Sequence, residues 1–442
     1  MHGIHLSPVR LSLVRLSRTF LASLFVAPLA CTPAATDERD AGPTGTVLGP
    51  CDLHDDCGAG DGRPGRRSEL SGVFDPQGER VIVFGGTDAI PENCGFPSPN
   101  FLDETWAFHT RCGIWKRIDG NAPSPRGRHM MAYDPGQHRA LLFGGRYRAR
   151  GASGNYTNYN DLWALDLSTD TWLELPTTNE PSARVNGAFV VDAEGSTAYL
   201  FGGSISPSGF AYAPQDDLWA LDLHTFAWTE LSPSGTLPPA RLFQAALFDP
   251  ARNRVVITGG ADETAFSNTA RYYRDVWAYD VATHAWMELH DGNGTAPAGR
   301  FWGEWVYDEE NDRYVLFGGH DDTELGNAND LWAFDPGTEV WAELRAGDTY
   351  NRPANGVCDF PPDFTNVDLE SPERRNAHVL VYAASTECPG VVTTMGKTDC
   401  GAVDDVHRFR LDEGVWQELA KANEGEMCLR AERPFDCQDM CF

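Results

Sequence analysis

Six arginines recur at one register of the chain and could form an anion-binding group. The first five each stand eight residues before an Asp that opens a tight turn. The sixth repeat lacks this Asp, and its arginine is placed by the same register. A guanidinium fork suits carboxylates and acidic peptides, so these residues are candidate ligand-binding groups. The alternative is that each arginine pairs with an Asp or Glu of the neighbouring repeat, because a charge that recurs in every repeat is usually structural. The six are Arg67, Arg126, Arg184, Arg241, Arg300 and Arg375.

Four residues near these arginines are further candidates for ligand binding. Trp302 and Glu304 belong to the segment RFWGEWVYD (300–308), where an indole could stack on a sugar or on an aromatic side chain. The alternative for Trp302 is packing. His129 and His378 each follow an arginine by three residues, and we expect them to be structural first.

Catalytic and metal-binding motifs are missing from the sequence. No nucleophile elbow, zinc-peptidase, phosphate-loop or dinucleotide motif occurs in a fitting context. The acidic segments GHDDTELGNAND (319–330) and GGADETAFSN (259–268) do not follow the calcium-loop spacing. His320 beside Asp321 and Asp322 could ligate a metal, but solvated loop residues are the simpler interpretation. We therefore predict no metal and no cofactor.

The elements that must position these residues come from a unit that is written six times. Five copies carry two Trp nine positions apart, from Trp106 and Trp115 to Trp332 and Trp341, and the sixth has His407 and Trp416 there. Before each pair lies an apolar run ending in Gly-Gly, such as VIVFGG (81–86), worn to VVTTMG (391–396) in the sixth copy. Short runs rich in Val, Phe, Tyr and Trp between such turns predict four strands per copy.

Six such sheets predict an all-β fold, a six-bladed β-propeller with four antiparallel strands per blade. One four-stranded sheet cannot bury both of its faces, whereas six stacked around an axis can. The Gly-Gly pair, the Asp after it and the paired aromatics resemble the kelch repeat over residues 67–419. We expect the Trp rings to fill the gaps between blades. The expected blades span about 67–120, 125–176, 182–232, 239–290, 298–345 and 373–419.

The kelch resemblance also implies a binding face. In kelch propellers the first strand of each blade lines the central channel, and it begins on the face that carries the loop after Gly-Gly. The six arginines should therefore ring one mouth of this channel. Long loops on a rigid scaffold are where binding usually resides. The long loops expected on this face are 87–101, 146–158, 204–215, 261–274 and 320–329.

The N-terminal residues predict export. Three arginines precede a short apolar run that ends at Cys31, which is typical of a signal peptide over residues 1–31. The position of Cys31 resembles the lipobox of bacterial lipoproteins, in which this Cys is lipidated, although Pro28 stands where the family prefers Leu. The alternative is an ordinary secretory signal. Residues 32–50 are interpreted as a flexible tether, and we expect an outer-membrane lipoprotein or a periplasmic or extracellular protein.

The ten remaining cysteines predict disulfides, because an even set in an exported protein usually forms a framework. They occupy a segment at 51–66, blade 1, the region after blade 5 and a tail at 420–442. If each repeat is one blade, no strand is shared where the last blade meets the first. We therefore expect at least one bridge between 51–112 and 358–441. The ten are Cys51, Cys57, Cys94, Cys112, Cys358, Cys388, Cys400, Cys428, Cys437 and Cys441.

The function expected from these features is binding rather than catalysis. A formal net charge of −29 argues against nucleic acid as the main partner. The leading hypothesis is a monomeric, envelope-anchored or secreted propeller that recognises a protein or a glycan on the long-loop face, with a lipid on Cys31 as its one link to a membrane. The first alternative is a carbohydrate-active enzyme similar to the bacterial sialic-acid epimerases, which are also kelch propellers. The second is a structural component of the cell envelope.

Overall fold

The computed structural model of the protein describes residues 51–54, 57–88, 99–209, 211–267, 269–322, 325–351, 365–385, 388–398 and 401–422. The chain divides into two units, 1–47 and 48–442, and the described residues all belong to the second. The expected signal peptide, Cys31, the tether and most of the Cys-rich tail lie outside these ranges. Within them, no helix has the length and apolar character needed to cross a membrane.

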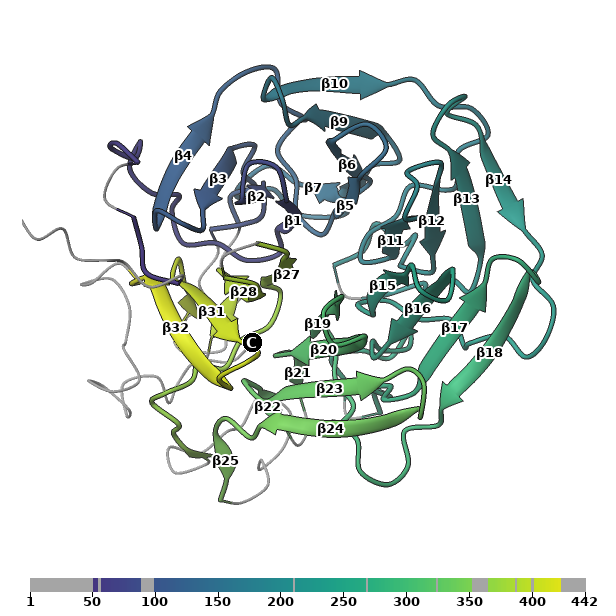
Figure 1. The fold of residues 1–442 in the computed structure, drawn as a ribbon. Coiled ribbons are helices and arrows are strands. Elements are labelled where there is room, and N and C mark those ends of the chain that lie inside the picture. Colours follow the sequence, from purple (N-terminus) through teal and green to yellow (C-terminus); the bar gives the residue numbers. More distant parts are fainter. Residues whose placement is uncertain are drawn as a thin grey trace, which may run out of the picture. The chain divides into compact units, whose positions relative to one another are not determined.

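The second unit is an all-β propeller of six blades, each a four-stranded antiparallel sheet, as the repeats predict (Figure 1). Blade 1 holds β1 (Ser71–Asp75), β2 (Arg80–Phe84), β3 (Thr105–His109) and β4 (Ile114–Ile118), and blade 2 holds β5 (Met130–Asp134), β6 (Arg139–Phe143), β9 (Leu162–Asp166) and β10 (Thr171–Leu175). Blade 3 holds β11 (Ala188–Val191), β12 (Thr197–Phe201), β13 (Leu218–Asp222) and β14 (Trp228–Leu231), and blade 4 holds β15 (Ala245–Asp249), β16 (Arg254–Thr258), β17 (Val276–Asp280) and β18 (Ala285–His290). Blade 5 holds β19 (Glu304–Asp308), β20 (Arg313–Phe317), β23 (Leu331–Asp335) and β24 (Val340–Arg345), and blade 6 holds β27 (Val379–Ala383), β28 (Gly390–Thr394), β31 (Val406–Arg410) and β32 (Val415–Ala420).

Within the described ranges, four two-stranded hairpins stand outside the blades. They are β7 (Arg146–Tyr147) with β8 (Thr157–Asn158), β21 (His320–Asp321) with β22 (Gly326–Asn327), β25 (Thr349–Tyr350) with β26 (Thr365–Asn366), and β29 (Lys397–Thr398) with β30 (Gly401–Ala402). Three of them start directly after the Gly-Gly position of their blade. They therefore organise the loops on the face where the first strands begin.

The first strand of every blade lies innermost. Strands β1, β5, β11, β15, β19 and β27 contact one another in sequence, and β27 contacts β1 to close the ring. Figure 1 shows these six strands around the axis, with β4, β10, β14, β18, β24 and β32 at the outer edge. The residues just before each first strand are thereby gathered at one end of the central channel.

An Asp ends the first strand of blades 1, 2, 4 and 5 and shapes the turn to the second strand. In blade 1, Asp75 Oδ1 accepts hydrogen bonds from the backbone N–H groups of Gln77 and Gly78 at 3.0 and 3.1 Å. The Arg80 Nε atom donates to Asp75 Oδ2 at 2.8 Å, so the side chain opening β2 locks the turn. An Asx turn of this kind fixes the hairpin register, which explains why the DP signal recurs.

The second Trp of most copies packs in the gap between blades, as expected. Trp172 of blade 2 lies edge-on to Phe84 of blade 1 at 5.4 Å between ring centroids. Trp228 lies 5.0 Å from Phe143 across the next gap. Because large rings fill wedge-shaped gaps efficiently, these residues serve the fold before any ligand.

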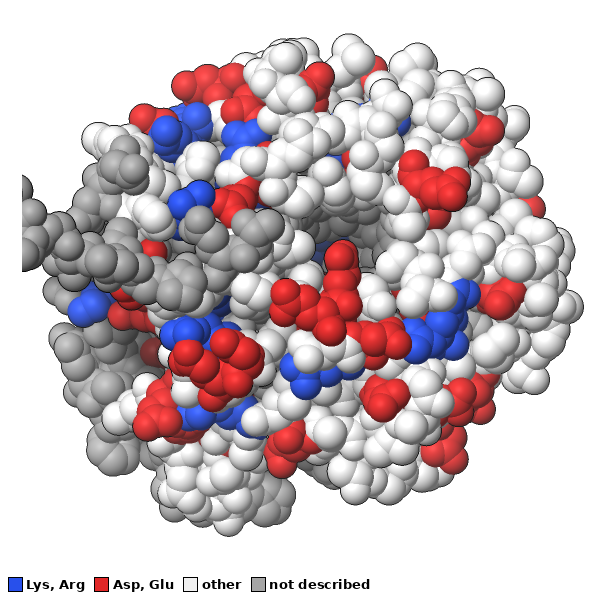
Figure 2. All heavy atoms as spheres, viewed as in Figure 1, with Lys and Arg blue, Asp and Glu red and all other residues white. Residues whose placement is uncertain are grey.

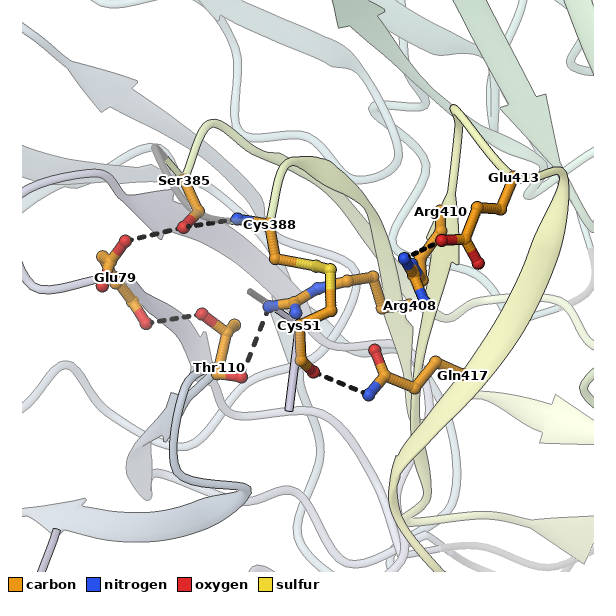
Figure 3. Close-up of a disulfide and its surroundings, with 9 residues drawn as sticks. All are labelled: Cys51, Glu79, Thr110, Ser385, Cys388, Arg408, Arg410, Glu413 and Gln417. Atoms are coloured by element: carbon orange, nitrogen blue, oxygen red, sulfur yellow. Dashed lines mark hydrogen bonds and ion pairs between the residues drawn. A yellow bond between two sulfur atoms is a disulfide. The ribbon is translucent and has the colours of Figure 1, made fainter. Parts of the chain in front are cut away.

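Blades 1 and 6 meet without exchanging a strand, and a disulfide fastens the seam (Figure 3). Cys51 bonds Cys388 across 337 residues of sequence, which is a bridge of the kind expected between the two ends of the propeller. Gln417 Nε2 donates to the Cys51 carbonyl at 2.9 Å, and Ser385 Oγ donates to Glu79 at 2.7 Å. A second disulfide joins Cys57 to Cys112. The other predicted disulfide cysteines, Cys94, Cys358, Cys400, Cys428, Cys437 and Cys441, lie outside the described residues.

Candidate functional site at the channel mouth

The six repeated arginines are buried clamps within the blades. Their exposed fractions are 3% or less. In blade 4, Arg241 donates two hydrogen bonds to Asp275 at 2.7 and 2.9 Å and one to the Gly259 carbonyl at 3.1 Å, while its Nε donates to the Pro239 carbonyl at 3.2 Å. The six carboxylate partners, in chain order, are Glu104, Asp161, Asp217, Asp275, Asp330 and Asp405.

In these clamps the arginine side chains are engaged by groups of the protein itself. All three nitrogens of the Arg241 guanidinium are engaged, and the Trp277 indole also donates to Asp275 at 2.8 Å. The partner acid belongs to the same blade, not to a neighbouring one. Each of these buried guanidiniums donates from all three of its nitrogens to oxygen atoms of the protein, and so holds the entry of its strand to the sheet. These clamps are the binding candidates Arg67, Arg126, Arg184, Arg241, Arg300 and Arg375.

The two candidate histidines are also structural. His129 lies edge-on to Phe84 at 5.4 Å, and His378 lies edge-on to Phe317 at 5.5 Å, so each imidazole sits between two blades. Burial lowers the pKa of both rings to about 3, with a further contribution from the neighbouring clamp arginine. Both are therefore neutral spacers at physiological pH.

The residues that face the channel stand two positions after each clamp arginine. All six have positive φ, between 47° and 63°. This left-handed conformation is rare for residues with a β-carbon, and for bulky ones such as Phe243 and Trp302 it stores strain of about 1–3 kcal/mol. Strain of this kind gathers at ligand sites. We name the set the mouth ring: Glu69, Arg128, Asn186, Phe243, Trp302 and Ala377.

Backbone hydrogen bonds join the mouth ring from blade to blade. The N–H of Arg128 donates to the Glu69 carbonyl at 2.7 Å, and the N–H of Asn186 donates to the Arg128 carbonyl at 3.1 Å. The same bond links Phe243 to Asn186 at 2.9 Å, Trp302 to Phe243 at 3.1 Å and Glu69 to Ala377 at 3.2 Å. Main-chain hydrogen bonds therefore make five of the six links around the mouth ring, and the side chains line the channel.

All six mouth-ring residues line one cavity of about 120 Å³. Its wall continues down the channel with Ser71, Met130, Phe189 and Glu304 among others. A cavity of this size would hold roughly eight to twelve waters, since each needs about 10–15 Å³. The central hollow of the ring is visible on the face shown in Figure 2.

Cations outnumber acids around Glu69. Arg128 forms a two-pronged ion pair with Glu69, with both contacts at 2.8 Å, and Arg146 lies 3.6 Å from the same carboxylate. Although burial alone would raise the pKa of Glu69, Arg128, Arg146 and Lys397 together hold it well below its usual range. Lys397 stands over the Trp302 ring at 5.9 Å. Three cations thus share one carboxylate.

This shared carboxylate leaves Arg146 and Lys397 incompletely neutralised. Burial, with repulsion from Arg128, lowers the pKa of Arg146 to about 10, and burial also lowers the pKa of Lys397. Among the described residues, the buried Nε atom of Arg146 has no hydrogen-bond partner. The Arg146 guanidinium lies 3.9 Å over the Tyr156 ring, which comes from the long loop 146–158. An anionic ligand would relieve both cations.

Glu304 presents the opposite case deeper in the channel. Its carboxylate makes no hydrogen bond or ion pair within the described part of the chain, and it lines the same cavity as Trp302. Burial alone raises its pKa to about 8. Of the ten candidate binding residues, Trp302, Glu304 and His129 line this cavity.

Most residues of this site were not among those predicted from the sequence. Glu69, Arg128, Asn186, Phe243 and Ala377 were available from the same register that identified the arginines, two residues later. Arg146 and Lys397 stand directly after the Gly-Gly position. The signal was variation: the frame residues repeat in all six copies, whereas the residues at these two positions differ from blade to blade.

The described residues contain no group of three or more His, Cys, Asp or Glu placed to hold a metal ion. His320 and Asp322 belong to a segment considered above for metal binding. Their side chains hydrogen-bond each other at 2.9 Å. The Tyr272 hydroxyl donates to Asp322 at 3.0 Å, and His320 also contacts Asn327 at 2.9 Å. This network ties the β21–β22 hairpin to blade 4.

Comparisons with known proteins agree with this architecture. A model of the KLHDC2/KLHL20/DRC7 Kelch-repeats domain matches residues 58–260 and 137–358. Kelch domain-containing protein 10 of Rattus norvegicus is 28% identical over 276 residues, which is 60% of this chain and 62% of that protein, and the Homo sapiens protein is 28% identical over 60% and 58%. The N-(sulfonatooxy)prop-2-enimidothioate sulfolyase of Thlaspi arvense is 27% identical over 266 residues, 56% of this chain and 70% of that protein. The chain spans less than two thirds of the length of the first of these relatives. With its six kelch repeats and this domain match, the chain belongs to the kelch-repeat family.

Proposed function

We propose that this protein is a binding propeller whose channel mouth recognises an acidic segment of a partner protein. The observation that carries the proposal is the pair Arg146 and Lys397, two cations that share an already paired carboxylate. An anionic side chain of the partner would supply the missing negative charge in a largely desolvated place, where a charge-assisted hydrogen bond is stronger than on an open surface.

The surroundings of these cations support a peptide ligand. Trp302, Phe243, Tyr156 and Tyr212 lie close by, because Arg128 stands over Trp302 at 4.9 Å and over Phe243 at 5.6 Å and contacts the Tyr212 hydroxyl at 3.5 Å. Aromatic and arginine side chains dominate the energetics of protein interfaces. The formal net charge of −29 makes this cationic mouth a local exception on an acidic molecule.

The proposal extends to location and partner class. Two disulfides support work in an oxidising compartment outside the cytoplasm. A glycan is the competing ligand, since an indole at a cavity rim also suits a sugar face. The acidic peptide is preferred because a neutral sugar would leave Arg146 and Lys397 without a counter-charge.

Peptide display against the full chain tests the proposal. We expect selected peptides to be enriched in Asp and Glu and to lose at least tenfold in affinity for the double variant Arg146→Glu/Lys397→Glu. Weakening by 150 mM added salt should be modest, because the contact is largely buried.

The matched control reverses two charges on the outer strand β4, Lys116→Glu and Arg117→Glu, far from the channel axis. This variant should bind the selected peptides as the parent does. Selection of peptides without acidic enrichment, equal binding by the mouth variant, or a neutral glycan that competes for the mouth would each overturn the proposal.

A further inference from the structure

The channel below the mouth ring contains an acid that has no hydrogen-bond or ion-pair partner among the described residues. Glu304 is the first residue of β19 and lines the cavity of about 120 Å³ together with the mouth ring. Glu304 is partly buried, and carboxylates withdrawn from bulk water are ordinarily paired or hydrogen-bonded, because desolvating an unpaired charge is costly. A lone carboxyl on the wall of a cavity therefore indicates a partner that comes from outside the chain.

The groups packed around Glu304 do not neutralise it. Of the titratable residues lining the cavity, Glu69 and Arg128 pair with each other, and His129 is neutral. The strands beside β19 are β20, β15 and β27. Their titratable residues lie toward the far ends of the strands, and His378, just before β27, is buried and neutral. These far-end residues are Arg313, Tyr314, Asp249 and Tyr382.

Glu304 is also electrostatically independent of the mouth cations Arg146 and Lys397. Burial is the one cause of its altered pKa, and neither Arg146 nor Lys397 contributes. The site is therefore bipolar: surplus positive charge stands at the mouth, and an unpaired acid stands deeper in the channel. A ligand complementary to both ends carries an acid outside and a cation inside.

We propose that the channel receives a primary alkylammonium group, the side chain of a lysine in the partner segment, and that Glu304 pairs with it. An extended aliphatic stem suits the apolar part of the wall, which includes Met130, Phe189 and Ala188. The ammonium supplies hydrogen-bond donors to a carboxylate that lacks them. This inference deepens the proposed function, because it names the second element that an acidic partner segment would carry.

Isothermal titration of the full chain with n-butylammonium chloride tests the inference. Free Glu304 is mostly protonated at pH 7, so binding an ammonium should release about 0.9 proton per site, measured by comparing buffers of different ionisation enthalpy. The affinity should rise roughly tenfold per pH unit below pH 8 and level off above it, until the amine itself deprotonates near pH 10.

Two variants identify the acid. Glu304→Gln keeps the shape of the side chain and should lose at least tenfold in affinity together with the pH dependence. Glu309→Gln changes an exposed acid in the turn after β19 and should bind as the parent does. Binding without proton release, equal binding by Glu304→Gln, or no binding at any pH from 6 to 9 would overturn the inference.

Two further measurements complete the test. One distinguishes a lysine side chain from a small free amine as the ligand, and the other distinguishes failure of this inference from failure of the proposed function. Nα-acetyl-lysine N-methylamide should bind more tightly than n-butylammonium; the reverse order would assign the channel to small free amines and overturn the lysine assignment. The Arg146→Glu/Lys397→Glu variant should still bind n-butylammonium with proton release. A propeller that loses its acidic peptides but keeps the amine would thus retain this inference without the mouth site, and the opposite pattern would retain the mouth site alone.

Discussion

At the residue scale, Glu304 makes the stability of the propeller depend on pH in the sense opposite to a salt-bridged acid. Its pKa is about 8 in the native state, against about 4.3 for an unfolded Glu. Between these values the native state holds a proton that the unfolded chain has released, so the free energy of unfolding contributed by this residue falls as pH rises. Glu304→Gln should therefore be more stable than the parent at pH 8 by about 2–4 kcal/mol and equal to it near pH 4. Urea denaturation at pH 4.5, 6 and 8 measures this, and two parallel pH profiles would contradict it.

The same scale shows where sequence reasoning reached its limit. The positions of the arginines could be predicted because six copies repeat them. Their hydrogen bonds to carboxylates and carbonyl groups could not, because these partners come from separate strands that meet only in the folded sheet. Arg241 and Asp275 are 34 residues apart, and no local pattern states that they touch. Glu304 was singled out as a departure from the repeat, yet its isolation follows from what the neighbouring blades do not supply.

At the scale of the element, each arginine clamp connects the entry of the first strand to the start of the third. Arg241→Met should destabilise the propeller by about 3–5 kcal/mol, because it leaves the Asp275 carboxylate buried with the Trp277 indole as its main remaining donor. Guanidinium denaturation followed by Trp fluorescence measures the loss. Arg117→Met, at a half-exposed ion pair on β4, is the matched control and should change stability by less than about 0.5 kcal/mol. Equal losses in the two variants would show that the clamp is no more than a surface contact.

At the scale of the whole molecule, the closing seam has no shared strand, and within the described residues one disulfide, Cys51–Cys388, reinforces it. Replacing Cys51 and Cys388 by Ser should lower the free energy of unfolding by about 3–5 kcal/mol, because the bridge encloses nearly the whole propeller. Replacing Cys57 and Cys112 by Ser should cost less, since that loop spans 55 residues. Thermal unfolding of the two double variants, each compared with the parent, provides the measurement. A larger loss from the shorter loop would contradict this account of the seam.

The architecture of the whole molecule was the most predictable property, and the reason is repetition. Each Gly-Gly, DP turn and Trp pair is weak alone, but six copies in register leave a radial arrangement as the way to bury both faces of every sheet. The connectivity of the disulfides was not predictable, because pairing depends on which cysteines the closed ring brings together. The expected bridge between the two ends followed from the distribution of Cys alone, and Cys51–Cys388 is such a bridge.

The main-chain bonds of the mouth ring have a consequence for how this molecule can change over evolutionary time. Main-chain N–H and C=O groups make five of the six links around this ring, so most of the rim is built without reference to the identity of the side chains. A point mutation at Asn186 or Ala377 alters what the channel presents while the scaffold that presents it is inherited intact. The side chains of the mouth ring can therefore vary while its backbone geometry stays the same. Paralogues with new ligands can arise through single substitutions in the mouth ring, without passing through an unfolded ancestor.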